Sequence, residues 1–232
     1  MKLAQLAFAC YIYSRMSNYD RSYIRFIEST KPQLDLQLEH HRMSLLKWLN
    51  NWGCRQFARE HHMLASEEIR KWYQESGARM FPADVTLLSL SNENLALVEE
   101  AYAGLFRRPA SRRRMNNGTE TRVEIGPTGA SKILFALRPL ALIPWDDPIR
   151  KRFGADGSPY SYTKFLRTVR TDLNELEQAC KEKGYIITDL PNLLGRPTSS
   201  IAKMIDEYFW VTETRGCTVP PEDEISRWAT WW

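Results

Sequence analysis

Apolar residues recur at intervals of three and four along most of this chain, the spacing that places side chains on one face of an α-helix. In the first half, this pattern predicts helices over Leu3–Met16, Tyr19–Ser29 and 34–52, one starting at Ser66 and one from Asn94 onward. The short apolar run at 87–90 is either a strand or the approach to the helix that follows. The first half is therefore expected to be helical.

The same pattern continues through the second half of the chain. It predicts a helix over 130–137, a long helix that begins at Ser158-Pro159 and ends at Gly184, and a helix over 198–210. Thr198 or Ser199 is the expected N-cap of the last of these, because a hydroxyl can accept the free N–H groups of a first helical turn. We assign the chain to the all-α class.

Residues 107–122 interrupt the helical pattern and form the best candidate for a linker. The segment contains Pro109 and the turn sequence Asn116-Asn117-Gly118, with too little apolar content to pack well. We expect a single unit with an N-terminal helical lobe at about 1–106, this linker, and a second lobe at about 123–232. The first helix of the chain can pack on the second lobe.

Composition adds the expectation of an anionic partner. The chain has 232 residues, long enough for a substantial core, and a net charge of only +4, but its basic residues are clustered. One cluster lies within the linker and the other at 150–152; the two clusters contain Arg107, Arg108, Arg112, Arg113, Arg114, Arg122, Arg150, Lys151 and Arg152. Such clusters favour a polyanion, although a solvated loop explains the first of them equally well.

Neither a metal site nor a membrane segment is expected. The four cysteines have no short spacing between them, which argues against zinc and against an iron–sulfur loop, and adjacent histidines on a helix face different directions. The apolar run that starts at Leu3 contains Gln5 and follows a single lysine, so a buried helix explains it better than a signal peptide. We expect a cytoplasmic monomer without a cofactor.

The most informative stretch is 123–154. A turn with Gly126 and Gly129 opens the helix over 130–137, Pro139 ends that helix, and an apolar connector leads to the adjacent carboxylates Asp146 and Asp147. Pro148 then suits the first turn of a short basic helix. Asp146 on its own is most simply a cap for that helix. Asp147, next to the proline, is the better cap, and this would leave Asp146 free for another role.

This arrangement resembles the helix–hairpin–helix DNA glycosylases, in which a Gly-x-Gly hairpin and an alanine-containing helix precede a Val-Asp whose carboxylate is catalytic. Here Glu124-Ile125-Gly126 stands at the hairpin, Ala130 in the helix and Trp145-Asp146 at the Val-Asp. The interval from Gly126 to Asp146 is 146 − 126 = 20 residues, close to the spacing that the family keeps. The resemblance covers about 120–170.

Two departures from the family pattern refine the expectation. Glu124 replaces the first hairpin glycine, and Thr128 stands where bifunctional members carry a Schiff-base lysine. Lys132 lies one helical turn further on. The resemblance therefore implies a monofunctional glycosylase that uses water as its nucleophile.

The resemblance also implies a fold of two helical lobes with a cleft between them, a catalytic carboxylate at Asp146, and a duplex DNA substrate. The expected contacts to the DNA backbone are Gly126, Thr128, Gly129, Lys132, Arg122 and Arg150. The expected base pocket contains Trp145, Tyr160 and Trp210, although aromatic residues at helical spacing usually belong to the core.

The substrate implied is double-stranded DNA that carries a damaged or modified base. This includes the hypermodified cytosines of some bacteriophages, so both repair and antiviral defence fit. The first alternative is a non-catalytic helix–hairpin–helix protein that binds DNA through the hairpin and the 198–210 helix. A third interpretation is an all-α interaction protein with no role on nucleic acid.

Overall fold

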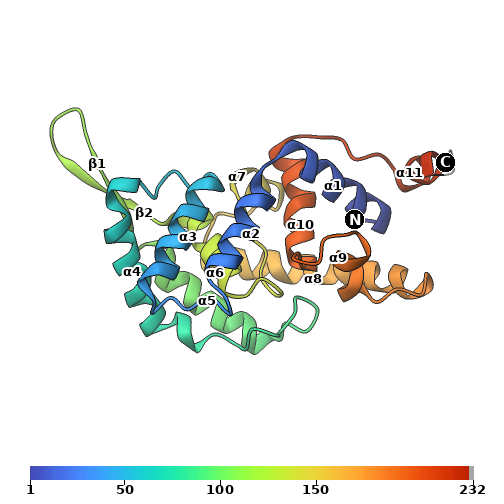
Figure 1. Ribbon diagram of the computed structural model, residues 1–232, viewed down its shortest axis with the longest axis horizontal. Helices are drawn as coiled ribbons and strands as arrows, with labels where there is room; N and C mark the ends of the chain where they lie inside the picture. Colours follow the sequence, from blue (N-terminus) through green and yellow to red (C-terminus); the bar gives the residue numbers. More distant parts are fainter. Residues whose placement is uncertain (230–232) are drawn as a thin grey trace.

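The computed structural model describes residues 1–229, and helices dominate it (Figure 1). The main elements are α1 (Leu3–Met16), α2 (Tyr19–Ser29), α3 (Glu39–Asn51), α4 (His62–Glu75), α5 (Asn92–Phe106), β1 (Pro109–Arg114), β2 (Glu120–Glu124), α6 (Gly126–Leu137), α7 (Asp147–Arg152), α8 (Pro159–Glu182), α9 (Leu190–Leu193), α10 (Ile201–Phe209) and α11 (Glu222–Ala229). The short helical turns are η1 (Arg59–His61), η2 (Gly77–Arg79), η3 (Ile187–Asp189) and the π-helical η4 (Trp210–Thr214). The prediction of an all-α class is confirmed.

Most predicted helices form where their apolar periodicity placed them. The helices α1 and α2 have the predicted bounds, and α6 ends two residues before Pro139. Local capping explains two further starts: the Ser91 hydroxyl accepts from the backbone N–H of Asn94 at 3.1 Å, and the Ser158 hydroxyl accepts from that of Ser161 at 3.2 Å. These starts depend on neighbouring residues alone.

Two helices begin later than predicted, because polar side chains stabilise turns before them. The carboxylate of Asp35 accepts the N–H of Gln37 at 2.8 Å, which forms a turn, and α3 starts only at Glu39. The cap of α10 is Ser200, whose hydroxyl accepts the N–H of Lys203 at 3.1 Å, so the expectation of Thr198 or Ser199 is wrong. The run at 87–90 is the irregular approach to α5.

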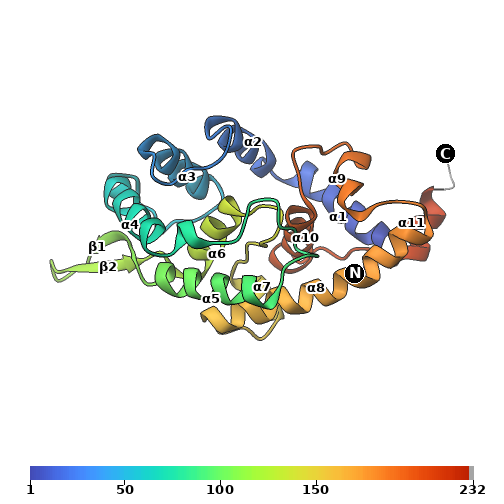
Figure 2. The same ribbon diagram turned by 90° about the horizontal axis from the view of Figure 1, so that it is seen from below.

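The prediction of a linker at 107–122 is wrong, because most of this segment forms an antiparallel hairpin of β1 and β2, with Arg112 opposite Arg122. Backbone hydrogen bonds hold the two strands together. The segment is rich in arginine and lacks the alternation of apolar and polar residues from which strands are predicted. In both views the hairpin projects from the end of the molecule that lies opposite α11 (Figures 1 and 2).

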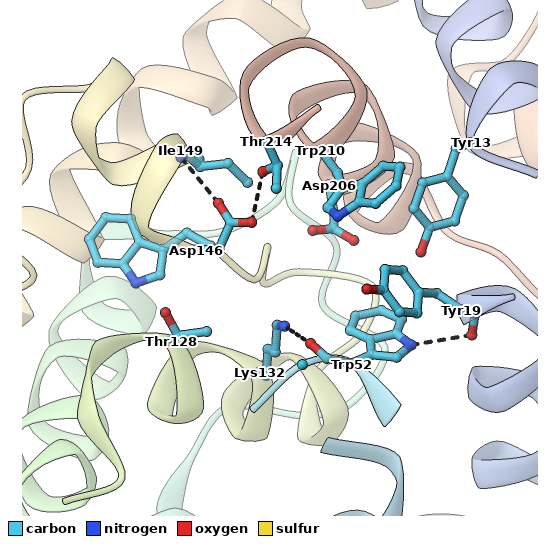
Figure 3. A pocket seen from close by; sticks show the side chains of 12 residues that line it. Tyr13, Tyr19, Trp52, Thr128, Lys132, Asp146, Ile149, Asp206, Trp210 and Thr214 are labelled. Atoms are coloured by element: carbon cyan, nitrogen blue, oxygen red, sulfur yellow. Dashed lines mark hydrogen bonds between the residues drawn. The ribbon is translucent and has the colours of Figure 1, made fainter. Parts of the chain in front are cut away.

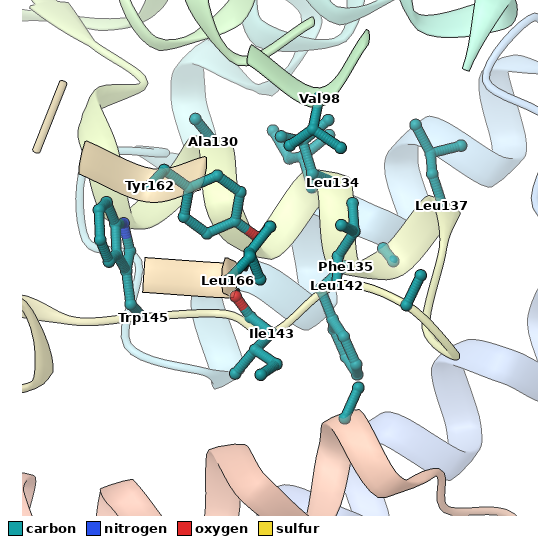
Figure 4. Close-up of a cluster of buried hydrophobic side chains, with 14 of the residues drawn as sticks. Val98, Ala130, Leu134, Phe135, Leu137, Leu142, Ile143, Trp145, Tyr162 and Leu166 are labelled. Atoms are coloured by element: carbon teal, nitrogen blue, oxygen red, sulfur yellow. Dashed lines mark hydrogen bonds between the residues drawn. The ribbon is translucent and has the colours of Figure 1, made fainter. Parts of the chain in front are cut away.

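The core is built around α6, whose side chains are buried on nearly every face. Figure 4 shows how Leu134 of α6, Val98 of α5 and Tyr162 of α8 gather in one cluster, with the connector residue Ile143 beside them. The Tyr162 hydroxyl donates to the Ile143 carbonyl at 2.9 Å, so the connector is fixed against α8. This packing places the residues that follow the connector at a defined position beside the first turns of α6.

The first helix of the chain packs on a helix near its end. The helices α1 and α10 lie side by side in both views, and the Cys10 thiol donates to the Met204 carbonyl at 3.6 Å (Figures 1 and 2). The N-terminal helix therefore packs against a helix from the last part of the described chain, while the division of the chain into two lobes stays a prediction. Among residues 1–229, no helix has both the length and the apolar character that a membrane crossing needs.

Candidate functional site

A cavity of about 190 Å³ lies where the first helices, the start of α6 and the end of α10 meet (Figure 3). Its lining residues come from segments spread over almost the whole chain: Tyr13, Tyr19, Trp52, Gly53, Thr128, Lys132, Trp145, Asp146, Ile149, Asp206, Trp210 and Thr214. The cavity therefore contains residues that the sequence singled out, among them Asp146 and Trp210, together with others, such as Tyr13 and Trp52, that it did not.

Asp146, and not Asp147, is the N-cap of α7. One carboxylate oxygen of Asp146 accepts the N–H of Ile149 at 3.2 Å, so the expectation that Asp147 would take this position is wrong. Asp147 is instead an exposed residue of the first turn, where hydrogen bonds from Lys151 and Arg150 lower the pKa of its carboxyl group. Proline is tolerated at the first or the second position of a helix. Pro148 therefore fits an N-cap at Asp147 or at Asp146, and the local sequence did not separate the two.

Capping does not remove Asp146 from the cavity. Its second carboxylate oxygen accepts a hydrogen bond of 2.7 Å from the hydroxyl of Thr214, which belongs to η4 (Figure 3). An ionised carboxylate has about four acceptor positions, and these two bonds use two of them. The group is thus held in one orientation from two sides while it keeps acceptor capacity toward the cavity.

Lys132 lies on α6 one turn beyond Thr128 and faces the same cavity. Its ammonium group donates to the Trp52 carbonyl at 2.6 Å and lies 5.6 Å from the centre of the Trp52 ring. These two contacts hold the cation against one wall of the cavity. Lys132 therefore lines the cavity and is close enough to Asp206 to affect the pKa of that carboxyl group, while its contact with a phosphate stays a prediction.

Aromatic side chains gather on the side of the cavity away from Asp146 (Figure 3). Trp210 meets Tyr13 edge-on at 5.2 Å and Tyr19 edge-on at 5.6 Å between ring centres, and Tyr19 lies 6.3 Å from Trp52. Such edge-to-face contacts favour fixed ring orientations. The sequence predicted only Trp210 of these four, since the others come from α1, α2 and the end of α3.

A second carboxylate, Asp206, lies among these rings and is almost fully buried. Burial raises its pKa from 3.8 to about 7, although the ammonium groups of Lys203 and Lys132 oppose the shift. A neutral or half-ionised carboxyl group in a cavity can both donate and accept hydrogen bonds. The sequence contained a signal for it: Lys203, Asp206 and Glu207 are charged residues within an otherwise apolar helix.

An ionic network behind the cavity wall fixes α10. The ammonium group of Lys203 is buried, with Glu207 at 2.7 Å and Asp206 and Asp20 each at 3.6 Å. Burial lowers the pKa of Lys203, but the attraction of Glu207 and the neighbouring acidic groups raises it by more than burial lowers it. The pKa of Lys203 is therefore well above its ordinary value. Arg196 binds both Asp20 and Glu207. These ion pairs join α2 to α10 and so fix the position of Asp206.

The glycine turn at the start of α6 is close to the cavity. Gly126 has φ +67, a conformation that glycine adopts readily, and Thr128 lines the cavity. The Thr128 hydroxyl accepts from the guanidinium of Arg150 at 2.9 Å, and that side chain is only 14% exposed. Gly129 is closely packed, because a Cβ there would lie 2.7 Å from Gln56 Nε2 and 2.9 Å from Ile125 Cγ2. Contact of these residues with phosphate stays a prediction.

The other predicted residues lie further from the cavity centre. Arg122 is exposed on β2, where its guanidinium donates to the Arg107 carbonyl. Trp145 also lines the cavity, but its ring is fully buried against Tyr162 and so belongs to the core. The expectation for Tyr160 is wrong: it is 62% exposed and lines a separate hollow between α7 and α8.

Comparisons with protein-family models, with curated proteins and with solved structures gave no match. Within residues 1–229, no group of three or more histidine, cysteine, aspartate or glutamate side chains is arranged to hold a metal ion.

Proposed function

We propose that this protein is a monofunctional DNA glycosylase of the helix–hairpin–helix type. It hydrolyses the N-glycosidic bond of a damaged or modified base in duplex DNA and leaves an abasic site. The observation that carries the proposal is the oriented carboxylate of Asp146 at one side of a cavity whose other side is built from aromatic rings (Figure 3).

The chemistry requires a negative charge beside the sugar. As the base departs, positive charge develops on the deoxyribose, and a fixed carboxylate in a poorly hydrated site stabilises it. The N–H of Ile149 and the hydroxyl of Thr214 hold Asp146 in place, so little reorganisation is needed when the charge appears. A remaining acceptor position can orient the attacking water molecule.

The aromatic side of the cavity suits a base that has left the DNA stack. A flipped base is held by stacking on aromatic side chains and by hydrogen bonds to its edge. Trp52 and Trp210 offer the stacking surfaces, and Asp206 offers a group that exchanges hydrogen bonds with the polar edge of the base. Asp146 and Asp206 thus take separate roles at the sugar and at the base.

Water is the nucleophile in this proposal. Thr128 occupies the place of the family's Schiff-base lysine, and the ammonium group of Lys132 is engaged with the carbonyl and the ring of Trp52. The start of α6 and Arg150 lie at the rim, where backbone N–H groups and a guanidinium can approach a phosphate next to the flipped nucleotide.

The first prediction concerns Asp146→Asn. Asparagine has nearly the same size as aspartate and keeps one oxygen that accepts hydrogen bonds, but it carries no charge. We therefore expect the rate of base release from the preferred modified duplex to fall by at least about 100-fold. Duplex binding should persist. The measurement is a panel of duplexes with damaged bases and hypermodified cytosines, treated with hot alkali to reveal abasic sites. The panel also identifies the base and separates a repair substrate from a phage one.

Asp147→Asn is the matched control, because it removes the same charge from the adjacent residue, which lies outside the cavity. Equal activity of the two variants would reject the role of Asp146. Duplex binding without release of any base by the unmodified chain would support the alternative, a non-catalytic DNA-binding protein. A borohydride-trapped adduct that disappears in Lys132→Gln would reject water as the nucleophile.

A further inference from the structure

The hairpin of β1 and β2 concentrates positive charge on an exposed projection. Residues 109–124 contain four arginines and two glutamates, and every residue from Arg112 to Arg122 is exposed. In the register of the hairpin, Arg112 pairs with Arg122 and Arg114 pairs with Glu120, and cross-strand partners point to the same face. One face of the hairpin therefore carries three arginines against one glutamate.

Most of this charge is not neutralised by the rest of the protein. Arg112 and Glu120 approach to 3.5 Å, and both side chains remain about 60% exposed. Among the described residues, no side chain forms an ion pair with Arg113 or Arg114. Like charges on neighbouring exposed positions repel one another, so a hairpin of this composition is suited to a polyanionic partner.

The hairpin is attached firmly to the segment that borders the cavity. At its base, the Ser111 hydroxyl donates to the Gln56 carbonyl at 2.7 Å, and the Gln56 amide donates to the Ile125 carbonyl at 2.8 Å. The strand β2 continues through Ile125 directly into the glycine turn of α6, which carries Thr128 at the cavity. Movement of the hairpin relative to the cavity is therefore restricted.

We propose that the β1–β2 hairpin is a DNA-binding arm that contacts the phosphates of the duplex on one side of the nucleotide held in the cavity. The inference rests on the proposed function in one respect, that the cavity receives a nucleotide. Six residues of β1 at about 3.3 Å each reach about 20 Å, which corresponds to about six base pairs at 3.4 Å each. Arg112 and Arg114 lie on one face at the outer end of this length, where they can meet phosphates of the duplex backbone.

Other polyanions fit the arm less well. Insertion into a membrane surface needs several exposed apolar side chains, and Met115 is the one large apolar residue exposed in the arm among the described residues. The turn residues Asn116 and Asn117 are polar and suit contact with a hydrated, regular backbone. Duplex DNA is therefore the partner to which we commit.

The test is the salt dependence of binding to a duplex that contains an uncleavable abasic analogue. Each lost phosphate contact reduces the magnitude of the slope of log K against log salt by about 0.9, so Arg112→Ser/Arg114→Ser, which changes two arginines on the same face, should reduce it by about 1.8. The control is Lys181→Ser/Lys183→Ser, which removes the same charge at the far end of α8 and should leave the slope unchanged.

A second arm of the experiment shortens the duplex on one side of the analogue at a time. The unmodified chain should lose affinity when about six base pairs are removed on one side only, and Arg112→Ser/Arg114→Ser should lose this asymmetry. Fluorescence anisotropy gives the affinities, and unchanged thermal unfolding of the variant shows that the fold is intact.

Each outcome separates this proposal from the glycosylase proposal. If the slope is unchanged in the arginine variant, or falls by the same amount as in the lysine control, the proposal of a DNA-binding arm is overturned even if base release is normal. A lowered slope without base release from any duplex would keep the arm and reject the enzyme. Equal losses with single strands or anionic vesicles, in place of duplex, would assign the arm to a different partner and overturn the proposal.

Discussion

At the scale of single residues, the cavity depends on side chains that serve the fold and the chemistry together. Asp146 accepts a hydrogen bond from a free N–H group in the first turn of α7 and also lines the cavity. Capping and the proposed catalytic role are therefore compatible interpretations of this residue. Asp206 is similar, because the ion pairs that fix α10 hold it in place. Loss of either residue is expected to change both stability and function.

The pKa of Asp206 predicts a pH dependence of stability. With a native pKa of about 7 and an ordinary value of 3.8, the folded chain holds a proton between these values that the unfolded chain releases. The free energy of unfolding therefore falls as pH rises through this window, and Asp206 adds no further change above it. Asp206→Asn cannot ionise and should show a weaker fall.

The measurement is urea unfolding at several pH values between about pH 5 and pH 7.5, with circular dichroism as the signal. Every other ionisable group is present in both chains, so the difference between the two pH profiles isolates Asp206. Parallel profiles for Asp206→Asn and the unmodified chain would contradict the raised pKa.

At the scale of elements, α6 links the core to the cavity. Its apolar residues pack between α5 and α8, while its first turns carry the glycine turn, Thr128 and Lys132 to the cavity. The sequence predicted this helix and its end well, since both depend on local spacing and on Pro139. It did not predict β1 and β2, because strand pairing joins backbone groups whose side chains here are charged and solvent-exposed.

Close packing at the start of α6 predicts that Gly129→Ala destabilises the protein. The new Cβ would lie 2.7 Å from Gln56 Nε2 and 2.9 Å from Ile125 Cγ2, and overpacking of this kind costs about 1–3 kcal/mol. Gly104→Ala is the matched control in another helix, where the nearest atom, Ser76 Oγ, lies at 3.2 Å. Both changes gain similar helix propensity.

Urea unfolding should therefore find Gly129→Ala less stable than Gly104→Ala by about 1–3 kcal/mol. Because Gln56 also joins the β1–β2 arm to Ile125, Gly129→Ala is expected to weaken duplex binding as well. Equal stability of the two variants would show that Gln56 and Ile125 move aside without cost.

At the scale of the whole molecule, helices from the first and the last parts of the described chain, α1 and α10 with η4, meet at the cavity. Tyr13 of α1 and Thr214 of η4 line the same space, and one continuous group of buried side chains extends from Leu6 to Phe209. The residues of the N-terminal helices therefore cannot unfold while the cavity remains intact. Cleavage of the chain into its two halves would divide both the core and the candidate site.

This continuity predicts a single cooperative unfolding transition. Circular dichroism reports on all the helices, whereas tryptophan fluorescence reports on buried rings such as Trp72 in α4 and Trp145 before α7. The two signals should change together in urea, with one midpoint. Two separated midpoints would mean that the halves have independent cores.

The sequence by itself determined the helices, because an apolar face of period 3.6 and a capping side chain act within a few residues. It also indicated Asp146 through a motif of fixed spacing. Only the tertiary structure decided which residues surround that carboxylate. Tyr13, Trp52 and Asp206 are brought together by packing between helices that are distant in the sequence, and the local sequence around each residue does not indicate its neighbours in space. For the same reason, the arginine-rich segment became a projecting hairpin only through the pairing of its backbone.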